Sequence, residues 1–119
     1  MTSGEDKRRF PRIEFRMPVQ YHNLKNPREG SIGSLTKNIS EGGVKFVANE
    51  FLPLASRLVM EISLPTVPRP IKAIAKVAWV RKTAVAEQYE VGNQFLEISR
   101  DDKNHLTDYI NRVFDSSSN

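Results

Sequence analysis

The residues best suited to bind an anion gather near the N-terminus, where residues 7–12 (KRRFPR) hold four cations. Pro11 fixes its own φ and biases Phe10 away from helix, so this stretch is expected to be extended. Arg8 and Arg12 would then lie ~13 Å apart, at ~3.3 Å per residue. Such a pair could clamp both ends of a small polyanion, or bind one phosphate and one base edge. A solvated basic tail is the alternative that this stretch alone favours.

A second stretch of polar and small residues follows at 38–43 (NISEGG). Asn38 and Ser40 are separated by one residue, so on an extended chain both side chains point the same way, toward one ligand edge. Gly43 suits a tight bend, which often needs a positive φ. The alternative reading is an ordinary turn closed by the Asn or Ser side chain.

Together the two stretches resemble the signature of the PilZ family, whose members bind cyclic di-GMP. That signature is Arg-x-x-x-Arg in an N-terminal arm, followed by Asp/Asn-x-Ser-x-x-Gly between two strands. The matching positions here are Arg8, Arg12, Asn38, Ser40 and Gly43. The resemblance continues in residues 77–80 (VAWV) and 91–96 (VGNQFL), and extends from Lys7 to about Phe114.

The resemblance implies that Arg8 and Arg12 contact guanine and phosphate, since a guanidinium fork pairs bidentately with either. Further candidates are Lys7, Arg9, Gly42 and Trp79. In the family, the residue before the arginine pair is linked to binding of one ligand or of a stacked pair. Lys7 occupies that position and leaves the stoichiometry open. Asn38 has one acceptor oxygen, so it cannot fully copy an aspartate that accepts from two guanine donors.

Alternating apolar residues predict strands over 13–21, 31–39, 44–48, 58–64, 71–79 and 89–95. Residues 31–48 should form a hairpin with NISEGG at its bend. Pro18 suggests that the first strand is an edge or carries a bulge. Trp79 continues the apolar face of its strand and is more typical of core filler than of a stacking platform. Gly92 indicates a bulge or a close backbone approach.

Two other segments should cover the strands. The loop 49–56 carries an apolar patch expected to cap one end of a barrel, namely Phe51, Leu52 and Leu54. Toward the C-terminus, apolar residues recur at helical spacing, namely Leu106, Tyr109, Ile110, Val113 and Phe114. Ser99 with Asp102 three residues later is typical of a capping box. These signals predict a helix over 99–114 that buries one stripe on the barrel.

Short strands with turn signals and one terminal helix predict a mainly β fold, an antiparallel barrel plus helix. The resemblance implies the same fold, with six strands. We expect one domain, 1–119, with a flexible basic arm at 1–12, the barrel at 13–98, the helix at 99–114 and a disordered tail at 115–119.

Composition narrows the function. The chain has no cysteine, so disulfides and thiolate metal sites are excluded. No segment approaches the ~20 apolar residues that cross a bilayer, and no signal peptide is evident, so a cytoplasmic protein is expected. Ser40 has no histidine or lysine at an activating spacing, and neither His22 nor His105 has a partner at metal spacing. We therefore expect a binding protein without metal or cofactor, not an enzyme.

The first functional hypothesis is a bacterial cyclic di-GMP receptor, a monomer or weak dimer. Its arm would close over the barrel on binding and signal to a separate effector protein. The second is a degenerate PilZ-like interaction adaptor that binds no nucleotide. A binder of single-stranded nucleic acid is disfavoured because most strand aromatics fall on the core-facing register.

Overall fold

The protein is a six-stranded barrel followed by one helix, and its computed structural model describes residues 16–117. The predicted arm, and residues 13–15 of the first predicted strand, lie outside the described residues. The elements are β1 (Pro18–Asn23), η2 (Pro27–Glu29), β2 (Ile32–Ile39), β3 (Gly43–Ala48), β4 (Arg57–Ile62), β5 (Ile71–Lys82), β6 (Tyr89–Ile98) and α1 (Arg100–Ser117).

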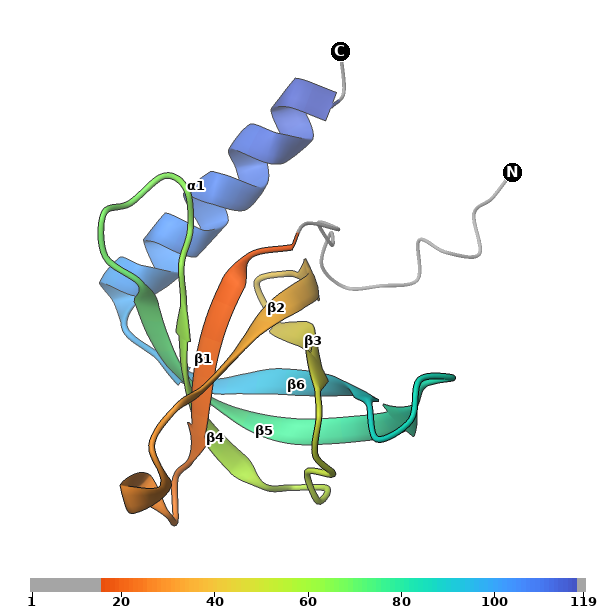
Figure 1. The fold of residues 1–119 in the computed structure, drawn as a ribbon. Coiled ribbons are helices and arrows are strands. Elements are labelled where there is room, and N and C mark those ends of the chain that lie inside the picture. The colour runs from red at the N-terminus through yellow and green to blue at the C-terminus, as the bar shows by residue number, and fades with distance from the viewer. Residues whose placement is uncertain (1–15, 118–119) are drawn as a thin grey trace.

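The six strands close into a barrel in the order β1-β2-β3-β6-β5-β4, with every neighbouring pair antiparallel (Figure 1). This confirms the predicted fold. The expectation that Pro18 marks an edge strand is wrong, because β1 pairs with both β2 and β4. Pro18 is instead the exposed first residue of β1, a position where its missing N–H is tolerated.

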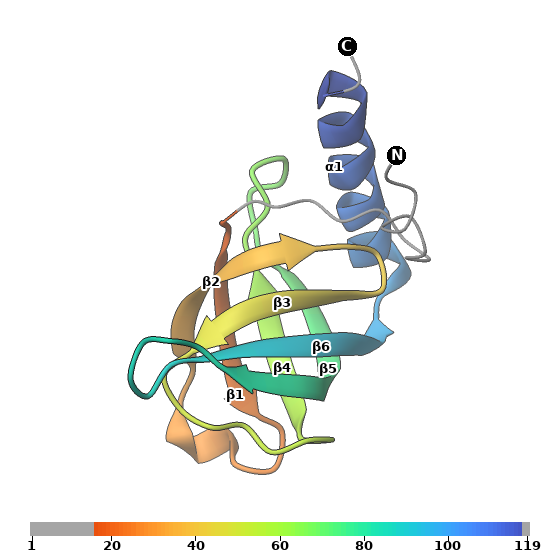
Figure 2. The same ribbon diagram turned by 90° about the vertical axis from the view of Figure 1, so that its right-hand side faces the viewer.

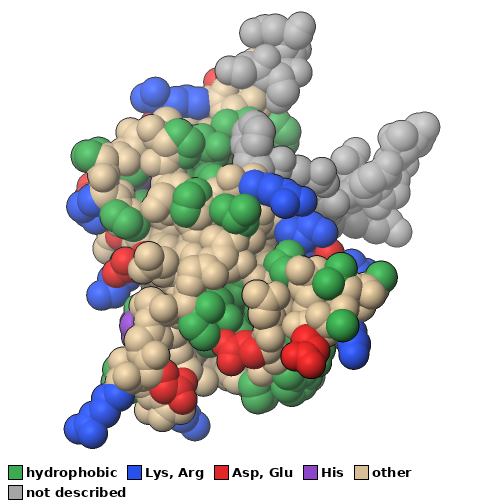
Figure 3. All heavy atoms as spheres, viewed as in Figure 1, with side chains coloured by type: hydrophobic (Ala, Val, Ile, Leu, Met, Phe, Trp, Pro, Cys, Tyr) green, Lys and Arg blue, Asp and Glu red, His purple; other side chains and the backbone are tan. Residues whose placement is uncertain are grey.

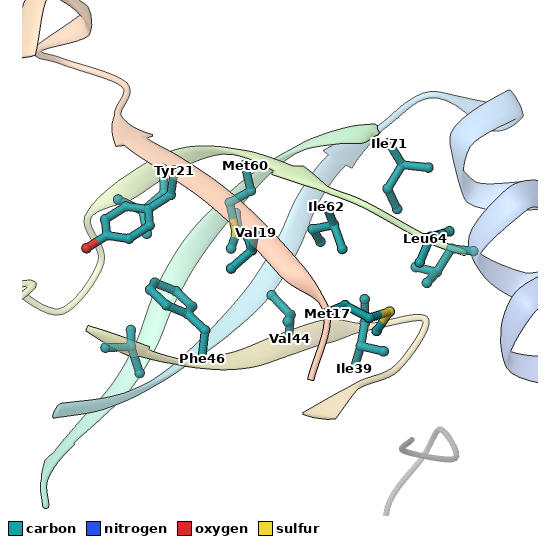
Figure 4. Packing of buried hydrophobic residues seen from close by; sticks show 14 of the residues in the cluster. Met17, Val19, Tyr21, Ile39, Val44, Phe46, Met60, Ile62, Leu64 and Ile71 are labelled. Atoms are coloured by element: carbon teal, nitrogen blue, oxygen red, sulfur yellow. The ribbon is translucent and has the colours of Figure 1, made fainter. Parts of the chain in front are cut away.

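The core lies inside the barrel and is built from the apolar positions of the strands (Figure 4). Tyr21 and Phe46 meet there with ring centroids 4.8 Å apart. The Tyr21 hydroxyl donates to Glu50 at 3.0 Å, which satisfies the polar tip of an otherwise buried ring. Alternation along the strands is therefore what separates the core from the outer face that carries the candidate site.

The loop between β3 and β4 only partly behaves as the sequence suggested. Leu52 is buried and joins the core, as expected of a cap. Phe51 and Leu54 are 59% and 64% exposed, so the prediction is wrong for these two. Phe51 packs edge-on against Tyr89, with centroids 5.8 Å apart, and Tyr89 in turn packs against the core.

The helix begins with the predicted cap, since Ser99 Oγ accepts from the backbone N–H of Asp102 at 3.1 Å. Leu106, Tyr109 and Ile110 are buried, whereas Phe114 is 42% exposed. Figure 1 shows why: the C-terminal half of α1 projects beyond the barrel. The helix also continues to Ser117, so the predicted tail is wrong over 115–117.

Candidate functional site

The Asn-x-Ser-x-x-Gly motif forms the turn between β2 and β3, as predicted. The backbone N–H of Ser40 donates to the Gly43 carbonyl at 2.9 Å. The Ser40 hydroxyl accepts from the N–H of Gly42 at 3.2 Å, and Ser40 is only 1% exposed. Its side chain therefore stabilises the turn, whereas Asn38 is half-buried. A direct contact between Ser40 and a ligand stays a prediction.

Gly43 is required by packing and not by backbone conformation. The expected positive φ is wrong, since among the described glycines only Gly30 adopts one. A Cβ built on Gly43 would overlap the carbonyl oxygen of Asn93 and lie 3.1 Å from the carbonyl carbon and 3.3 Å from Gln94 Cα. The motif glycine thus allows β3 to approach the backbone of β6.

The strand register places Asn38 and Trp79 in one row across four strands. Asn38 lies opposite Lys45, Lys45 opposite Gly92, and Gly92 opposite Trp79. Both neighbours of Lys45 in β3 are buried, so its side chain points outward. Figure 2 shows these strands side by side in the order β2, β3, β6, β5. Three strand spacings of ~4.8 Å make the row ~14 Å long.

Trp79 lies on this outer face because an irregularity in β5 interrupts the alternation of inward and outward side chains before Trp79. The register with β6 shifts between Val77 and Trp79, so Val77 is buried while Trp79 is 41% exposed. Val80 packs against the core instead. The prediction of Trp79 as core filler is therefore wrong. Its ring covers Gly92, where a Cβ would overlap the indole, so the close neighbour of Gly92 is a side chain and not the backbone that was expected. The expected bulge does occur beside Gly92, but on β5.

Two cations flank the indole of Trp79. Lys45 Nζ and Arg81 Cζ each lie 5.9 Å from the ring centroid, within reach of a cation–π contact. An exposed aromatic ring beside cationic groups is the arrangement with which proteins bind nucleobases and phosphates together.

A buried carboxylate links these cations. Glu90 accepts from Lys37 Nζ at 2.7 Å, lies 4.0 Å from Lys45 Nζ and is paired with Arg81. The hydrogen bond from Lys37, then that from Arg81, lowers the pKa of Glu90 from 4.5 to about 2, against the opposing effect of burial. Three cations against one carboxylate leave the face positively charged.

Sequence reasoning missed Lys37, Lys45 and Glu90 as members of the site. Alternation over 44–48 could have placed Lys45 on the outer face. Nothing in the sequence gives the β2–β3, β3–β6 and β5–β6 registers, and those registers bring the four charges together.

A hollow of about 390 Å³ adjoins the cluster at the start of the described chain, and both Arg16 and Lys37 line it. The backbone N–H of Met17 donates to Thr36 Oγ1 at 2.9 Å, and the N–H of Thr36 donates to the Met17 carbonyl at the same distance. The chain therefore enters the barrel alongside β2. Figure 3 shows Lys and Arg side chains together in this region.

A larger open hollow of about 1010 Å³ lies beside the start of α1 and suits an anion less well. Its apolar lining residues include Val59, Ile74 and Leu96. Its charged lining residues are Glu41, Lys72, Glu97, Asp102 and Lys103. Two lysines against three carboxylates give this surface a negative balance, so the smaller hollow is the better match for a phosphate.

The four predicted contacts in the arm are Lys7, Arg8, Arg9 and Arg12, and all of them lie outside the described residues. Within residues 16–117, no group of three or more His, Asp or Glu side chains is placed to hold a metal ion. In the same part of the chain, no helix is both long and apolar enough to cross a membrane.

Fold and site define a small antiparallel barrel with one terminal helix and a cationic, aromatic outer face. The model of the PilZ domain matches residues 6–112, and the chain belongs to that family. Among curated protein sequences, none matches it.

Solved structures share this fold. The inhibitor of motility MotI/DgrA from Bacillus subtilis is 24% identical, with a TM-score of 0.76 over 92% of this chain and 52% of that one. The PilZ domain of Escherichia coli YcgR, solved with c-di-GMP, is 14% identical, with a TM-score of 0.67 over 94% and 98%. A second structure of E. coli YcgR in complex with c-di-GMP is 16% identical, with a TM-score of 0.74 over 94% of this chain and 48% of that one. The chain thus spans about half of the MotI/DgrA structure.

Proposed function

We propose that this protein is a receptor for cyclic di-GMP, which it binds on the outer face formed by β2, β3, β6 and β5. The row from Asn38 to Trp79 carries the proposal. A guanine can stack on the exposed indole of Trp79, while phosphate oxygens meet Lys45 and Arg81. Membership of the PilZ family, and the c-di-GMP bound in two structures of E. coli YcgR, support this choice of ligand.

In this proposal, some residues of the Asn-x-Ser-x-x-Gly motif contact the ligand and the others stabilise the turn. Asn38 offers a hydrogen bond to a base edge from the same row as Trp79. Gly42 and Gly43 contribute mainly through the turn, as does Ser40, whose hydroxyl bonds within it. Catalysis is not part of the proposal, because in the described part of the chain the buried Ser40 hydroxyl accepts from the Gly42 N–H and donates to the Gly43 carbonyl, which binds it to the turn backbone and not to a base.

The basic arm supplies Arg8 and Arg12, with Lys7 and Arg9 adding charge. Arg12 precedes Arg16 by four residues, so it can reach ~13 Å from the point where the described chain begins. That reach is comparable with the ~14 Å length of the row from Asn38 to Trp79, which begins on β2, the strand alongside which the chain enters the barrel. Fixing each arm residue costs ~1–2 kcal/mol, and each charge-assisted hydrogen bond returns ~1.5–3 kcal/mol. Several arginine contacts therefore offset the ordering of a short arm.

Closure of the arm would create a new surface for a separate effector protein. We propose a cytoplasmic protein, a monomer or weak dimer, that signals by this route. Amide hydrogen exchange across residues 5–14, with and without ligand, tests closure. Slower exchange with ligand is expected, and identical exchange would rule closure out.

Isothermal titration calorimetry tests the proposed ligand. At low salt we expect heat with cyclic di-GMP, at an affinity near ~1 μM, and none with cyclic GMP or a short oligonucleotide. Arg8→Ala and Arg12→Ala should abolish the heat, while Arg28→Ala, on exposed η2, should leave it unchanged. No heat with any ligand would favour the degenerate adaptor. Heat with the oligonucleotide would favour a nucleic-acid binder.

A further inference from the structure

Glu90 occupies an unusual position on the proposed binding face. Its carboxylate meets one cation from each of three other strands: Lys37 from β2, Lys45 from β3 and Arg81 from β5. Glu90 itself belongs to β6, so the cluster ties together all four strands of the face. No other carboxylate among the described residues meets three cations within 4.0 Å in the ion pairs of this structure.

The carboxylate of Glu90 is buried, whereas the side chains of Lys37 and Arg81, which pair with it, are more exposed. The Glu90 side chain is 10% exposed, whereas the side chains of Lys37 and Arg81 are 38% and 67% exposed. An anionic ligand would therefore approach the cations from the solvent side, while Glu90 pairs with them on the side that faces the barrel. This geometry excludes Glu90 as a direct contact and makes it a support for the groups that touch the ligand.

Removing the negative charge would leave three like charges on neighbouring strands. Like charges repel, and Lys and Arg side chains gain rotamer freedom when they move into water. Arg81 and Lys45 would then leave the positions from which they flank Trp79, 5.9 Å from its ring centroid. The effect would reach the indole although Glu90 is in neither of its cation–π contacts.

We propose that Glu90 is a positioning residue, whose buried carboxylate holds Lys37, Lys45 and Arg81 in one preformed platform with Trp79 for a guanine nucleotide's phosphates and base. The inference rests on the proposed function for the identity of the ligand. The geometry of the platform is independent of that choice. Preformed side chains bind more tightly because less freedom is lost on association.

Glu90→Gln distinguishes a positioning role of Glu90 from a purely electrostatic one, because the two roles predict opposite changes in ligand affinity. The substitution makes the face more positive, so long-range attraction alone would tighten binding of a dianion. Positioning predicts weaker binding, by about tenfold, since two or three side chains must be ordered anew. The matched control is Glu61→Gln, the same chemical change at an exposed position on β4.

The experiment measures the affinity for cyclic di-GMP by calorimetry in wild type, Glu90→Gln and Glu61→Gln. Far-UV circular dichroism confirms that each variant is folded at the assay temperature. Weaker binding in Glu90→Gln, with Glu61→Gln equal to wild type or slightly tighter, supports the inference. Equal or tighter binding in Glu90→Gln overturns it, provided that wild type binds. No binding by wild type refutes the proposed function instead.

A second readout needs no ligand. Trp79 is the only tryptophan, so its fluorescence reports the platform in the free protein. Glu90→Gln should change the emission maximum and the iodide quenching of Trp79, because Lys45 and Arg81 leave the ring. Unchanged emission and quenching in a folded Glu90→Gln protein would overturn the inference even if nucleotide binding proved absent.

Discussion

Replacing Gly43 with alanine should destabilise the barrel, although alanine is the smallest change available. The new Cβ would overlap the Asn93 carbonyl oxygen, well inside the 3.0 Å that real Cβ atoms essentially never breach. The obstacle is backbone, so no side-chain rotation can relieve it. The two strands must separate where Gly43 lies opposite Gln94 and the Phe95 N–H donates to the Gly42 carbonyl at 3.0 Å.

The expected cost follows from those contacts. Overpacking a close contact costs ~1–3 kcal/mol, and each backbone hydrogen bond that weakens adds ~1 kcal/mol. The sum of ~2–4 kcal/mol is a large share of the ~5–15 kcal/mol that stabilises a typical domain. For a chain of 119 residues, at about 4 °C per kcal/mol, the melting temperature should fall by about 8–16 °C.

Thermal and urea unfolding followed by circular dichroism measure this cost. Gly33→Ala is the matched control, because it lies on β2, is exposed, and a Cβ there meets nothing within 4 Å. Its φ is not positive, so alanine should be neutral or slightly stabilising. Equal melting temperatures for wild type and Gly43→Ala would refute the packing argument, as would equal losses in both variants.

Three further outcomes are expected. Trp79→Ala should weaken cyclic di-GMP binding by about 5–100-fold, the loss of one base stack, and Trp79→Phe should retain most of the affinity; equal affinity in all three proteins would exclude stacking. Gly92→Ala should push the indole off β6, shifting Trp79 emission to the red in a still-folded barrel, whereas an unshifted spectrum would contradict the ring's position. The pKa of Glu90 is lowered from 4.5 to about 2, so its stabilisation is complete above pH ~4.5 and is lost as pH falls toward 2. The difference in urea midpoint between wild type and Glu90→Gln should therefore shrink from pH 6 to pH 3, and a constant difference would contradict the assignment.

Much of the fold follows from local pattern in the sequence. Alternation identified all six strands, and helical spacing with the Ser99 cap identified α1. These signals are local, since side-chain direction repeats every two residues in a strand and every three to four in a helix. The ends of the elements were less well predicted. The helix was expected to stop at Phe114 but continues to Ser117, because no glycine or proline follows Phe114 to end it.

The site was harder to predict because it depends on register. The irregularity between Val77 and Trp79 turns the tryptophan outward, and no glycine or proline within β5 marks it; Gly92, on the opposite strand, indicated a bulge but not which residues it would turn. The contacts of Glu90 depend on which residues lie opposite one another on four strands. The resemblance to the PilZ family supplied the motif positions, but it did not indicate Lys37, Lys45 or Glu90.

The most direct test of the account is a map of amide and indole resonances of ¹⁵N-labelled protein during titration with cyclic di-GMP. We expect the largest shifts at Asn38, Lys45 and Gly92 and at the indole N–H of Trp79, with little change at Val59 and Ile74, which line the larger hollow. A spectrum that stays unchanged at saturating ligand, or that shifts only around the larger hollow, would contradict binding on this face.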